Sequence, residues 1–463
     1  MIRRSLQQAA HMIGPEATLS SSDIGEIVIH GVTIDSRKIQ KGNLFIPFKG
    51  DKTDGHQYVE AAIQNGAAAA FWQKDVPNPP KHLPLIFVSD PLVSIQQLAK
   101  SYRHELDIKV VGITGSNGKT STKDITTNLL SLKYKVQKTE GNYNNHLGLP
   151  LTVLSLEEDT NIAVLEMGMS GRGEIDFLTR LAEPDVVVIT NIGESHLQDL
   201  GSREGIAEAK LEILNGLKEG GRIVYFGDEP LLTGKIPSLK KADSESCSFG
   251  LEDNNNLYPF DIVESSTGSK FKINTSAQEF SLPILGKHNI LNALAGMLVA
   301  DYFDISYEQM NEGFENLKLT NMRMELVEGK GGLKIINDAY NASPTSMRAA
   351  INVLQSLPGF KSKVLVLGDM LELGSEEAIF HYSIGEAIDA AAIDYVFTFG
   401  KLGEHIAEGA KTVLADNRVR SFLDKSELIK ELEQVVDADT AVLVKASRGM
   451  RLEEVVKALQ SSV

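Results

Sequence analysis

The sequence lacks most of the features that mark secreted or membrane-embedded proteins. Its 463 residues include a single cysteine, Cys247, which excludes an intramolecular disulfide framework and fits a reducing compartment. No run approaches the roughly 18 apolar residues of a membrane span, and no apolar signal-peptide core follows Arg3 and Arg4. We therefore expect a cytoplasmic protein without a membrane span.

Positive charge is also scarce. The 46 lysines and arginines are outnumbered by 62 acidic residues, so the formal net charge is −16. Such a chain has no general positive field to attract a polyanion, and we expect no nucleic-acid partner. A few cations and backbone dipoles can still bind a nucleotide locally. The length predicts about three domains, which the 42% hydrophobic content can supply with cores, and we expect a monomer.

One stretch organises the rest of the chain: residues 110–122, VVGITGSNGKTST. An apolar run ends in a glycine-rich turn, and a helix-compatible segment follows. The loop amides and the helix terminus can hold a phosphate, Lys119 can neutralise its oxygens, and Thr120 can hold Mg²⁺. We predict phosphate contacts from Gly115, Ser116, Asn117, Gly118, Lys119, Thr120 and Ser121. Ile113 replaces the first glycine of the standard pattern, so a purely structural turn remains the alternative.

The pattern of apolar runs predicts an α/β protein with three domains. Residues 1–105 form a small N-terminal α/β domain, residues 106–318 a central phosphate-loop-type domain with a doubly wound parallel sheet, and residues 319–463 a C-terminal Rossmann-like α/β domain. The expected strands are 27–34, 43–48, 67–72, 84–89, 108–114, 162–166, 185–190, 222–226, 333–338, 363–369, 395–400, 411–416 and 441–447. The polar residues 240–282 predict exposed hairpins and loops.

Strand ends carry the next candidates, because ligands of doubly wound sheets bind beyond the carboxyl ends of the strands. Strand 162–166 ends in Glu166, and strand 185–190 leads to His196. With Thr120, Glu166 makes a hard-oxygen Mg²⁺ site, while His196 suits a second metal or a phosphate. A solvated strand end and a hydrogen-bonded loop histidine are the structural alternatives for each residue alone. Their convergence with the phosphate loop favours function.

Other polar residues are ambiguous when read alone. Ser36 and Arg37 suit an anionic ligand, but ordinary turn chemistry explains them equally well. Lys210 lies in a segment with helical periodicity, where a lysine is normally solvated surface. His288 and Asn289 stand at the start of an apolar helix, where side chains can face a ligand.

Ten motifs, taken in order, resemble those of the Mur ligases, the ATP-dependent amino-acid-adding enzymes of peptidoglycan synthesis. They are GITGSNGKT (112–120), GNYNNHLGLPLT (141–152), LEMGM (165–169), TNIGESHLQDLGS (190–202), EAKLEI (208–213), GKHNILNALA (286–295), MRME (322–325), NDAYNASPTSM (337–347), GDMLELG (368–374) and VKASRG (444–449). The resemblance covers essentially the whole chain. DAYNASPTSM, GDMLELG and the DSR segment are similar to the member that adds D-alanyl-D-alanine. The implied substrates are ATP, D-alanyl-D-alanine and UDP-N-acetylmuramoyl-tripeptide.

The resemblance also implies roles for individual residues. Lys119, Glu166, His196 and Lys210 would be catalytic, and Mg²⁺ ions would bind Thr120, Glu166 and His196. Lys210 would be carbamylated by CO₂ into a further metal or phosphate partner, which requires a neutral amine and therefore a lowered pKa. Implied ATP contacts beyond the phosphate loop are Asn289, Arg323 and Asp338. Implied substrate contacts are Ser36 and Arg37 for UDP, Asn144 and Asn145 for the muramoyl part, and Tyr340, Asn341 and Arg448 for the dipeptide.

Several alternatives stay open at this level. A sister Mur ligase that adds a single amino acid is the nearest. A folylpolyglutamate synthase-like ligase shares the chemistry but normally lacks a UDP-binding domain such as residues 1–105. A phosphate-loop kinase would not need a C-terminal α/β domain such as residues 319–463, and a nucleotide-binding regulatory protein would not need Glu166 and His196 beside the phosphate loop. Domains joined near residues 105 and 318 also predict closure that keeps water from an acyl phosphate.

Overall fold

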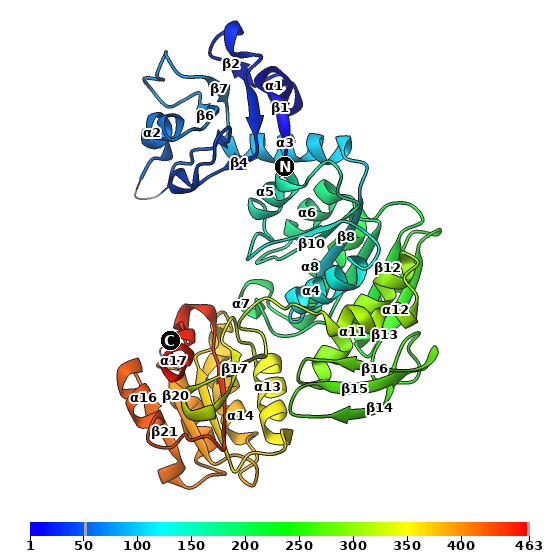
Figure 1. Cartoon of the computed structure of the whole chain (residues 1–463), viewed down its shortest axis with the longest axis vertical. Helices are drawn as coiled ribbons and strands as arrows, with labels where there is room; N and C mark the ends of the chain where they lie inside the picture. The colour runs from blue at the N-terminus through cyan, green and yellow to red at the C-terminus, as the bar shows by residue number, and fades with distance from the viewer. Residues whose placement is uncertain (51–52, 461–463) are drawn as a thin grey trace.

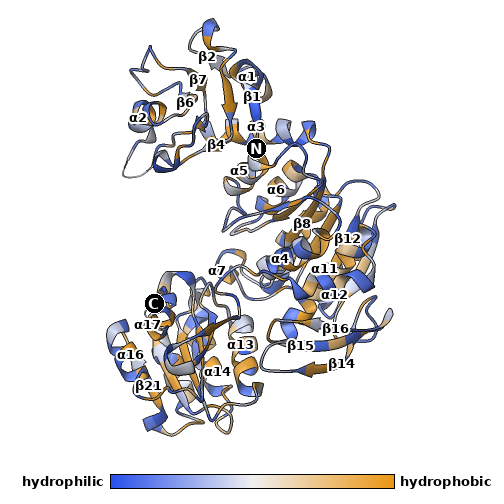
Figure 2. Cartoon of the chain, viewed as in Figure 1, coloured by the Kyte–Doolittle hydropathy of each residue, from blue (hydrophilic) through white to orange (hydrophobic). Residues whose placement is uncertain are grey.

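The computed structural model describes residues 1–50 and 53–460, which form three α/β regions in sequence order along the long axis (Figure 1). The strands of the large sheets are hydrophobic, and more polar helices and loops surround them (Figure 2). The predicted α/β class is therefore confirmed, while the domain limits at 105 and 318 stay predictions. None of the described helices is long and apolar enough to cross a membrane.

Within residues 1–50 and 53–105, the N-terminal region has a five-stranded sheet in the order β2-β7-β6-β5-β4. β2 runs antiparallel to β7, the other neighbours pair in parallel, and β1 pairs separately with β3. The elements are β1 (Arg3–Ser5), α1 (Leu6–Ile13), β2 (Thr18–Leu19), β3 (Val28–His30), β4 (Val32–Thr33), β5 (Leu44–Phe45), α2 (Val59–Gln64), β6 (Ala69–Gln73), β7 (Leu85–Val88) and α3 (Pro91–Glu105). The carboxylate of Asp90 caps α3, which leads into the central region.

Between residues 106 and 318, all of which the structure describes, six parallel strands form a sheet in the order β13-β12-β11-β8-β10-β9. The elements up to the last of these strands are β8 (Lys109–Thr114), α4 (Lys119–Leu130), β9 (Val136–Lys138), α5 (Gly148–Ser155), β10 (Ile162–Glu166), α6 (Glu174–Ala182), β11 (Val186–Ile189), α7 (Leu197–Leu200), α8 (Arg203–Leu211), β12 (Arg222–Phe226), α9 (Pro230–Thr233), α10 (Ile236–Leu239) and β13 (Glu245–Phe249). Val110 and Val111 of β8 enter different hydrophobic clusters, so both faces of the sheet are covered.

The register of this sheet assembles the predicted strand ends. Glu166 of β10 pairs with Ile113 of β8, and Ile189 of β11 pairs with Thr114. Since β10 and β11 flank β8 on opposite sides, the crevice for a ligand lies at the end of β8, where the phosphate loop begins.

The polar segment 240–282 contains the predicted hairpins. Antiparallel strands β14 (Pro259–Glu264), β15 (Ser269–Ile273) and β16 (Ser276–Leu282) form a small sheet. Phe271 and Phe280 stack at 5.7 Å between ring centroids and are fully buried, which anchors the sheet on the core. Helices α11 (Lys287–Tyr302) and α12 (Tyr307–Glu315) follow.

Across the described residues 319–460, a six-stranded sheet has the order β17-β18-β22-β19-β20-β21, with β17 antiparallel to β18. The elements are β17 (Glu325–Glu328), β18 (Lys334–Asp338), α13 (Pro344–Ser356), β19 (Ser362–Gly368), α14 (Glu377–Glu386), β20 (Tyr395–Phe399), α15 (Gly403–Ala410), β21 (Val419–Phe422), α16 (Lys425–Leu432), β22 (Thr440–Lys445) and α17 (Glu453–Leu459).

One predicted strand is wrong. Residues 411–416 form turns after α15 instead of a strand, because Leu414 N donates to Ala410 O and Thr412 Oγ1 donates to Gly409 O. The edge strand is β21, Val419–Phe422, which pairs in parallel with β20. The apolar residues at 413–415 therefore follow the C-terminal end of a helix. A short apolar run alone does not distinguish a strand from a helix end.

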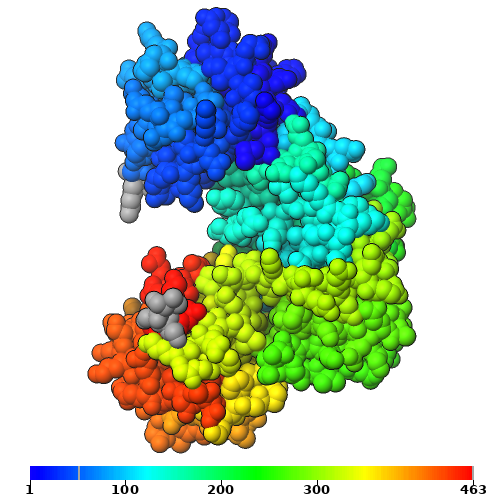
Figure 3. All heavy atoms as spheres, viewed as in Figure 1, coloured from blue at the N-terminus to red at the C-terminus, as the bar shows by residue number. Residues whose placement is uncertain are grey.

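A recess separates the N-terminal region from the C-terminal region in the space-filling view (Figure 3). The central region forms the back of this recess, so ligands that touch all three regions would have to span it or draw its walls together.

Candidate active site

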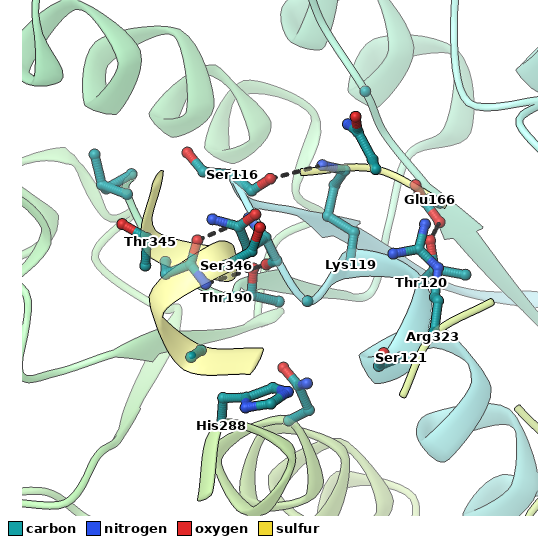
Figure 4. Close-up of a pocket in the computed structure, with 18 of the residues that line it drawn as sticks. Ser116, Lys119, Thr120, Ser121, Glu166, Thr190, His288, Arg323, Thr345 and Ser346 are labelled. Atoms are coloured by element: carbon teal, nitrogen blue, oxygen red, sulfur yellow. Dashed lines mark hydrogen bonds between the residues drawn. The ribbon is translucent and has the colours of Figure 1, made fainter. Parts of the chain in front are cut away.

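A cavity of about 740 Å³ lies where the phosphate loop meets the C-terminal region (Figure 4). It is lined by the loop after β8, the ends of β10 and β11, the start of α11, and the segments that flank β18. The sequence-predicted residues in its wall are Ser116, Asn117, Gly118, Lys119, Thr120, Ser121, Asn144, Asn145, Glu166, His196, Lys210, Asn289, Arg323, Asp338, Tyr340 and Asn341. Its volume suits a nucleotide-sized ligand.

The phosphate loop is held in shape by the neighbouring strand end. Thr190 Oγ1 donates to Asn117 O at 2.5 Å, and Asn117 N donates to Asn191 Oδ1 at 2.9 Å. Gly118, the residue before α4, has φ +80°, and a Cβ there would stand 2.4 Å from Asn292 Oδ1. Only glycine fits this position, so the loop backbone lies open to the cavity.

Lys119 begins α4 and lies back over the loop. Its Nζ donates to Gly115 O at 2.7 Å. Burial lowers the pKa of Lys119, with a further contribution from Arg323 and against the attraction of Glu166. A phosphate bound in the phosphate loop would supply negative charge that balances Lys119 and Arg323.

Glu166 and Thr120 meet as predicted from the strand ends. The Thr120 hydroxyl donates to Glu166 Oε2 at 2.8 Å, and Asn144 Nδ2 donates to Oε1 at 2.9 Å, while Glu166 is only 3% exposed. Two hard oxygens beside Lys119 fit Mg²⁺, which usually takes one or two protein ligands and completes its shell with phosphates and water. The described residues contain no cluster of three or more His, Cys, Asp or Glu side chains that would hold a metal alone.

Lys210 is buried in the cavity wall, which contradicts the interpretation of a solvated surface lysine. It lies on α8 with 2% of its surface exposed. Burial lowers the pKa of Lys210 well below its ordinary value, and Lys119 adds to this effect. The neutral amine that carbamylation needs is thereby favoured.

His196 has a positive backbone φ and lies beside a carboxylate from the C-terminal region. Its φ is +64°, and its Nδ1 lies 3.2 Å from Glu372 Oε2. Burial lowers the pKa of His196, against the attraction of Glu372 and with the help of Lys119 and Lys210. The neutral imidazole this produces suits a metal or a proton-transfer partner, and the second metal site stays a prediction.

The start of α11 forms the far wall. Asn289 Nδ2 donates to Leu285 O, and Asn292 Nδ2 donates to Asn289 Oδ1, both at 2.9 Å. Burial lowers the pKa of His288 to about 4. This wall is therefore uncharged and hydrogen-bonding, which suits a nucleobase more than a phosphate.

Arg323 enters the cavity from the segment that joins the central and C-terminal regions. Its guanidinium stacks over the ring of Tyr340 at 4.2 Å, and its buried Nε has no partner among the described residues. The flanking residues Met322 and Met324 have φ of +62° and +51°. Left-handed non-glycine residues cost about 1–3 kcal/mol each, and such strain concentrates at functional sites.

Asp338 closes the cavity at the end of β18. Lys445 Nζ lies 2.5 Å from Asp338 Oδ2 and also donates to Asn341 O at 3.0 Å, and Met324 N donates to Asp338 Oδ1 at 3.1 Å. Lys445 is 2% exposed, so the ion pair fixes this corner of the cavity.

A second cavity of about 290 Å³ adjoins the first. Both are lined by Ser116, Lys119 and His196, and Tyr340 and Asn341 also reach both. Arg448 lines the second cavity but not the first, and its Nη1 donates to Glu453 Oε1 at 2.9 Å. The residues predicted for the dipeptide therefore gather beside the phosphate loop.

Ser36 and Arg37 line neither cavity. They lie in the N-terminal region, where Arg37 pairs with Asp35 at 2.9 Å and is 87% exposed in its side chain. Hydrogen bonds from Arg37 lower the pKa of Asp35 to about 2. The structure thus keeps the residues predicted for UDP apart from those predicted for ATP.

Comparison with known proteins addresses the resemblance directly. The family model "Mur ligase middle domain" matches residues 113–300, "Mur ligase, glutamate ligase domain" matches 322–448, and "Mur ligase family, catalytic domain" matches 28–103. The chain belongs to the Mur ligase family.

Similar Mur ligases cover nearly all of the chain. A Bacillus subtilis protein named UDP-N-acetylmuramoyl-tripeptide–D-alanyl-D-alanine ligase is 51% identical over 462 residues, 100% of this chain and 99% of its own. The crystal structure of MurF from Acinetobacter baumannii superposes with a TM-score of 0.89 at 28% identity, over 99% of both chains. MurF from Thermotoga maritima in complex with ADP gives 0.81 at 30% identity, over 93% of this chain and 97% of that one.

The structure of this Mur ligase adds residues that the sequence did not single out. Arg203 and Glu229 line the main cavity and pair at 2.6 Å. Ser343 Oγ donates to Asn117 Oδ1 at 3.0 Å, which joins the C-terminal region to the phosphate loop. Asn292 follows Asn289 by one helical turn, and Ser343 precedes a proline that starts α13. The local sequence pattern could therefore have indicated both residues. Arg203 and Glu229 are 26 residues apart and carried none.

Proposed function

We propose that this Mur ligase joins D-alanyl-D-alanine to UDP-N-acetylmuramoyl-tripeptide in the cytoplasm, with ATP converted to ADP and phosphate. The observation that carries this proposal is the position of Lys119 in the walls of both cavities. A phosphoryl group held there adjoins a nucleotide-sized space on one side and a dipeptide-sized space on the other. The name of the relative that is 51% identical supports the choice of substrates.

The chemistry requires an activated carboxyl group. A carboxylate and an ammonium ion do not condense in water, whereas an acyl phosphate has a good leaving group. Lys119 and the loop amides bind the transferring γ-phosphoryl group and stabilise the charge that develops on it. When bound at Thr120 and Glu166, Mg²⁺ would supply further charge neutralisation and orient the phosphates.

Lys210 and His196 act on the acceptor side. Burial favours the neutral Lys210 amine, which can attack CO₂ to form a carbamate and release a proton. The carbamate then places an anionic oxygen ligand beside Lys119. The surroundings of His196 lower its pKa and favour the neutral imidazole. His196 would orient the Lys210 carbamate and Lys119.

The dipeptide binds in the smaller cavity. Its carboxylate pairs with Arg448, and Tyr340 and Asn341 contact its backbone. Its neutral amine then faces the phosphoryl site at Lys119 and attacks the carbonyl carbon of the acyl phosphate. The C–N bond forms, the C–O bond to phosphate breaks, and the departing phosphate can take the proton that the nitrogen loses. Binding in two adjoining cavities turns a reaction between two separate molecules into one between positioned groups.

The test measures phosphate release by the full-length protein with ATP, Mg²⁺, UDP-N-acetylmuramoyl-tripeptide and D-alanyl-D-alanine, leaving out each component in turn. We expect phosphate release to require both the UDP-tripeptide and the dipeptide. The product should be heavier than the UDP-tripeptide by the mass of two alanine residues. Release with a single amino acid in place of the dipeptide, or with a folate in place of the UDP substrate, would assign a sister ligase instead. The variant Glu166→Gln is the matched control, because it keeps the shape of the site and removes the carboxylate charge.

A further inference from the structure

The segment between the central and C-terminal regions is tied to the phosphate-loop helix by one buried carboxylate. Asp124 lies on α4, five residues after Lys119, and is 1% exposed. Its Oδ2 accepts a hydrogen bond from Thr320 N at 2.7 Å. Thr320 follows α12 and precedes Arg323, so this contact joins the helix that starts at the phosphate loop to the connecting segment 316–324.

The two oxygens of Asp124 have separate tasks. Oδ1 accepts from Lys138 Nζ at 2.6 Å and lies 3.5 Å from Lys123 Nζ, so the ion pairing is concentrated on that atom. Lys123 in turn donates to Thr139 O at 2.8 Å. Oδ2 is left for the backbone amide of Thr320. A carboxylate present only to neutralise two lysines would not need this second bond.

After Thr320 the backbone bonds change region. Met322 N donates to Glu325 Oε2 at 2.9 Å, and Met324 N donates to Asp338 Oδ1 at 3.1 Å. The acceptors Glu325 and Asp338 both belong to the C-terminal sheet. Thr320 therefore marks the point at which the chain leaves the central region.

Arg323 lies between these anchors in a conformation that needs both. The residues on either side of it have positive φ, which persists only when surrounding contacts fix the backbone at each end. With both ends held, Arg323 lines the nucleotide cavity, its guanidinium stacked on Tyr340 and its buried Nε without a hydrogen-bond partner among the described residues. Release of one end would let the segment relax and move the guanidinium.

We propose that Asp124 is a positioning residue that ties the connecting segment to the phosphate-loop helix and so places Arg323 against the bound nucleotide. α4 transmits the placement, because Lys119 and Asp124 lie about 7.5 Å apart along one rigid helix at roughly 1.5 Å per residue. The phosphate cradle and the arginine that reaches it from the connecting segment are thus aligned by one element. The inference rests on the proposed function only for its kinetic readout, since nucleotide binding can be measured without an acceptor.

The test removes the bond from each side. Asp124→Ala removes the side-chain acceptor, and Thr320→Pro removes the N–H donor without changing α4. Thr320→Ala keeps the donor and is the matched control. Asn128→Ala is a second control, because Asn128 Nδ2 donates from the same helix to Gly313 O at 2.8 Å, and Gly313 lies on α12, before the connecting segment.

A hydrogen bond to a charged group changes an equilibrium roughly 10- to 100-fold. We expect about a ten-fold or greater rise in the Kd and KM for ATP in Asp124→Ala and Thr320→Pro, while the KM for the UDP substrate stays within two-fold. Thr320→Ala and Asn128→Ala should bind ATP like the wild type. Calorimetric titration with ATP and Mg²⁺ gives the Kd, and circular dichroism of each variant shows whether it is folded.

Unchanged ATP affinity in a folded Asp124→Ala or Thr320→Pro protein would overturn the proposal. An equal loss in Asn128→Ala would also overturn it, because the effect would then come from general loosening of α4. Should Thr320→Pro fail to fold, Asp124→Ala decides alone. Normal ATP binding by the wild type with no ligation of the expected substrates would refute the proposed function and leave this inference standing.

Discussion

Replacement of Lys210 by methionine should make the protein more stable and inactive at once. Lys210 is 2% exposed, and burial together with Lys119 lowers its pKa well below the ordinary value. Folding therefore either buries a charge beside another cation or requires loss of a proton. Methionine keeps most of the apolar stem and removes this cost.

The magnitude follows from proton linkage. Between the folded-state pKa of Lys210 and its unfolded value near 10.5, the unfolded chain binds one proton more than the folded chain. The unfolding free energy of the wild type therefore rises with pH by about 1.4 kcal/mol per unit in that window. Lys210→Met lacks this group, so its stability advantage is largest at neutral pH and shrinks as the pH approaches 10.

Carbamylation adds a second signature. A ligand that binds only the folded state at ten times its dissociation constant stabilises by about 1.4 kcal/mol. For a domain of about 200 residues this corresponds to a rise in Tm of roughly 3–5 °C. Bicarbonate should raise the Tm of the wild type by that order and leave Lys210→Met unchanged.

The assay is scanning calorimetry of both proteins from pH 7 to 10, with and without bicarbonate, alongside phosphate release. The variant should lose at least about 100-fold in kcat, in line with the removal of one charge-stabilising group. In Lys210→Ala, where a space is left, acetate should restore part of the activity. Full activity of either variant would refute the reasoning. A wild-type Tm that is the same with and without bicarbonate would also refute it.

Further substitutions probe the rest of the site. Glu166→Gln should lower kcat about 100- to 1000-fold in the phosphate assay with little change in Tm, because the isosteric amide fills the same space. Gly118→Ala should weaken ATP binding at least about ten-fold by calorimetry, since its Cβ would stand 2.4 Å from Asn292 Oδ1 at φ +80°; near-normal affinity would mean that the loop can shift. Arg448→Ala should raise the KM for D-alanyl-D-alanine about ten-fold and leave the KM for ATP unchanged, whereas a change only in the latter would place Arg448 at the nucleotide. Small-angle scattering should show a smaller radius of gyration with all ligands bound, and identical curves would contradict domain closure.

Much of the nucleotide site could be predicted from the sequence because its geometry follows from sheet rules. Apolar runs place the strands, and parallel pairing brings the ends of β8, β10 and β11 to one edge, so Thr120 and Glu166 had to lie close together. Their 2.8 Å hydrogen bond is a consequence of register. The metal role of this pair stays a prediction.

Other features depend on tertiary packing that local patterns do not encode. Helical periodicity placed Lys210 on a helix but did not show that its face of α8 turns inward. The contacts of Asp124 with Thr320 and of Asn117 with Ser343 join residues 196 and 226 positions apart. The error at residues 411–416 has the same origin, because a short apolar run suits a buried strand and a helix end equally well.

The two cavities together suggest why a three-domain chain is needed. Lys119 and His196 of the central region line both cavities, yet Arg323, Asp338 and Arg448 come from the chain beyond Thr320. Under the proposed function, docking of the C-terminal region would complete the nucleotide site and the dipeptide site together. Ser36 and Arg37, the residues predicted for UDP, belong to the N-terminal region. That region lies across the recess from the C-terminal region (Figure 3), so under the proposed function it would bind the acceptor apart from the other two sites. An acyl phosphate formed at Lys119 would have to be kept from water, and we expect closure across the recess to serve this purpose.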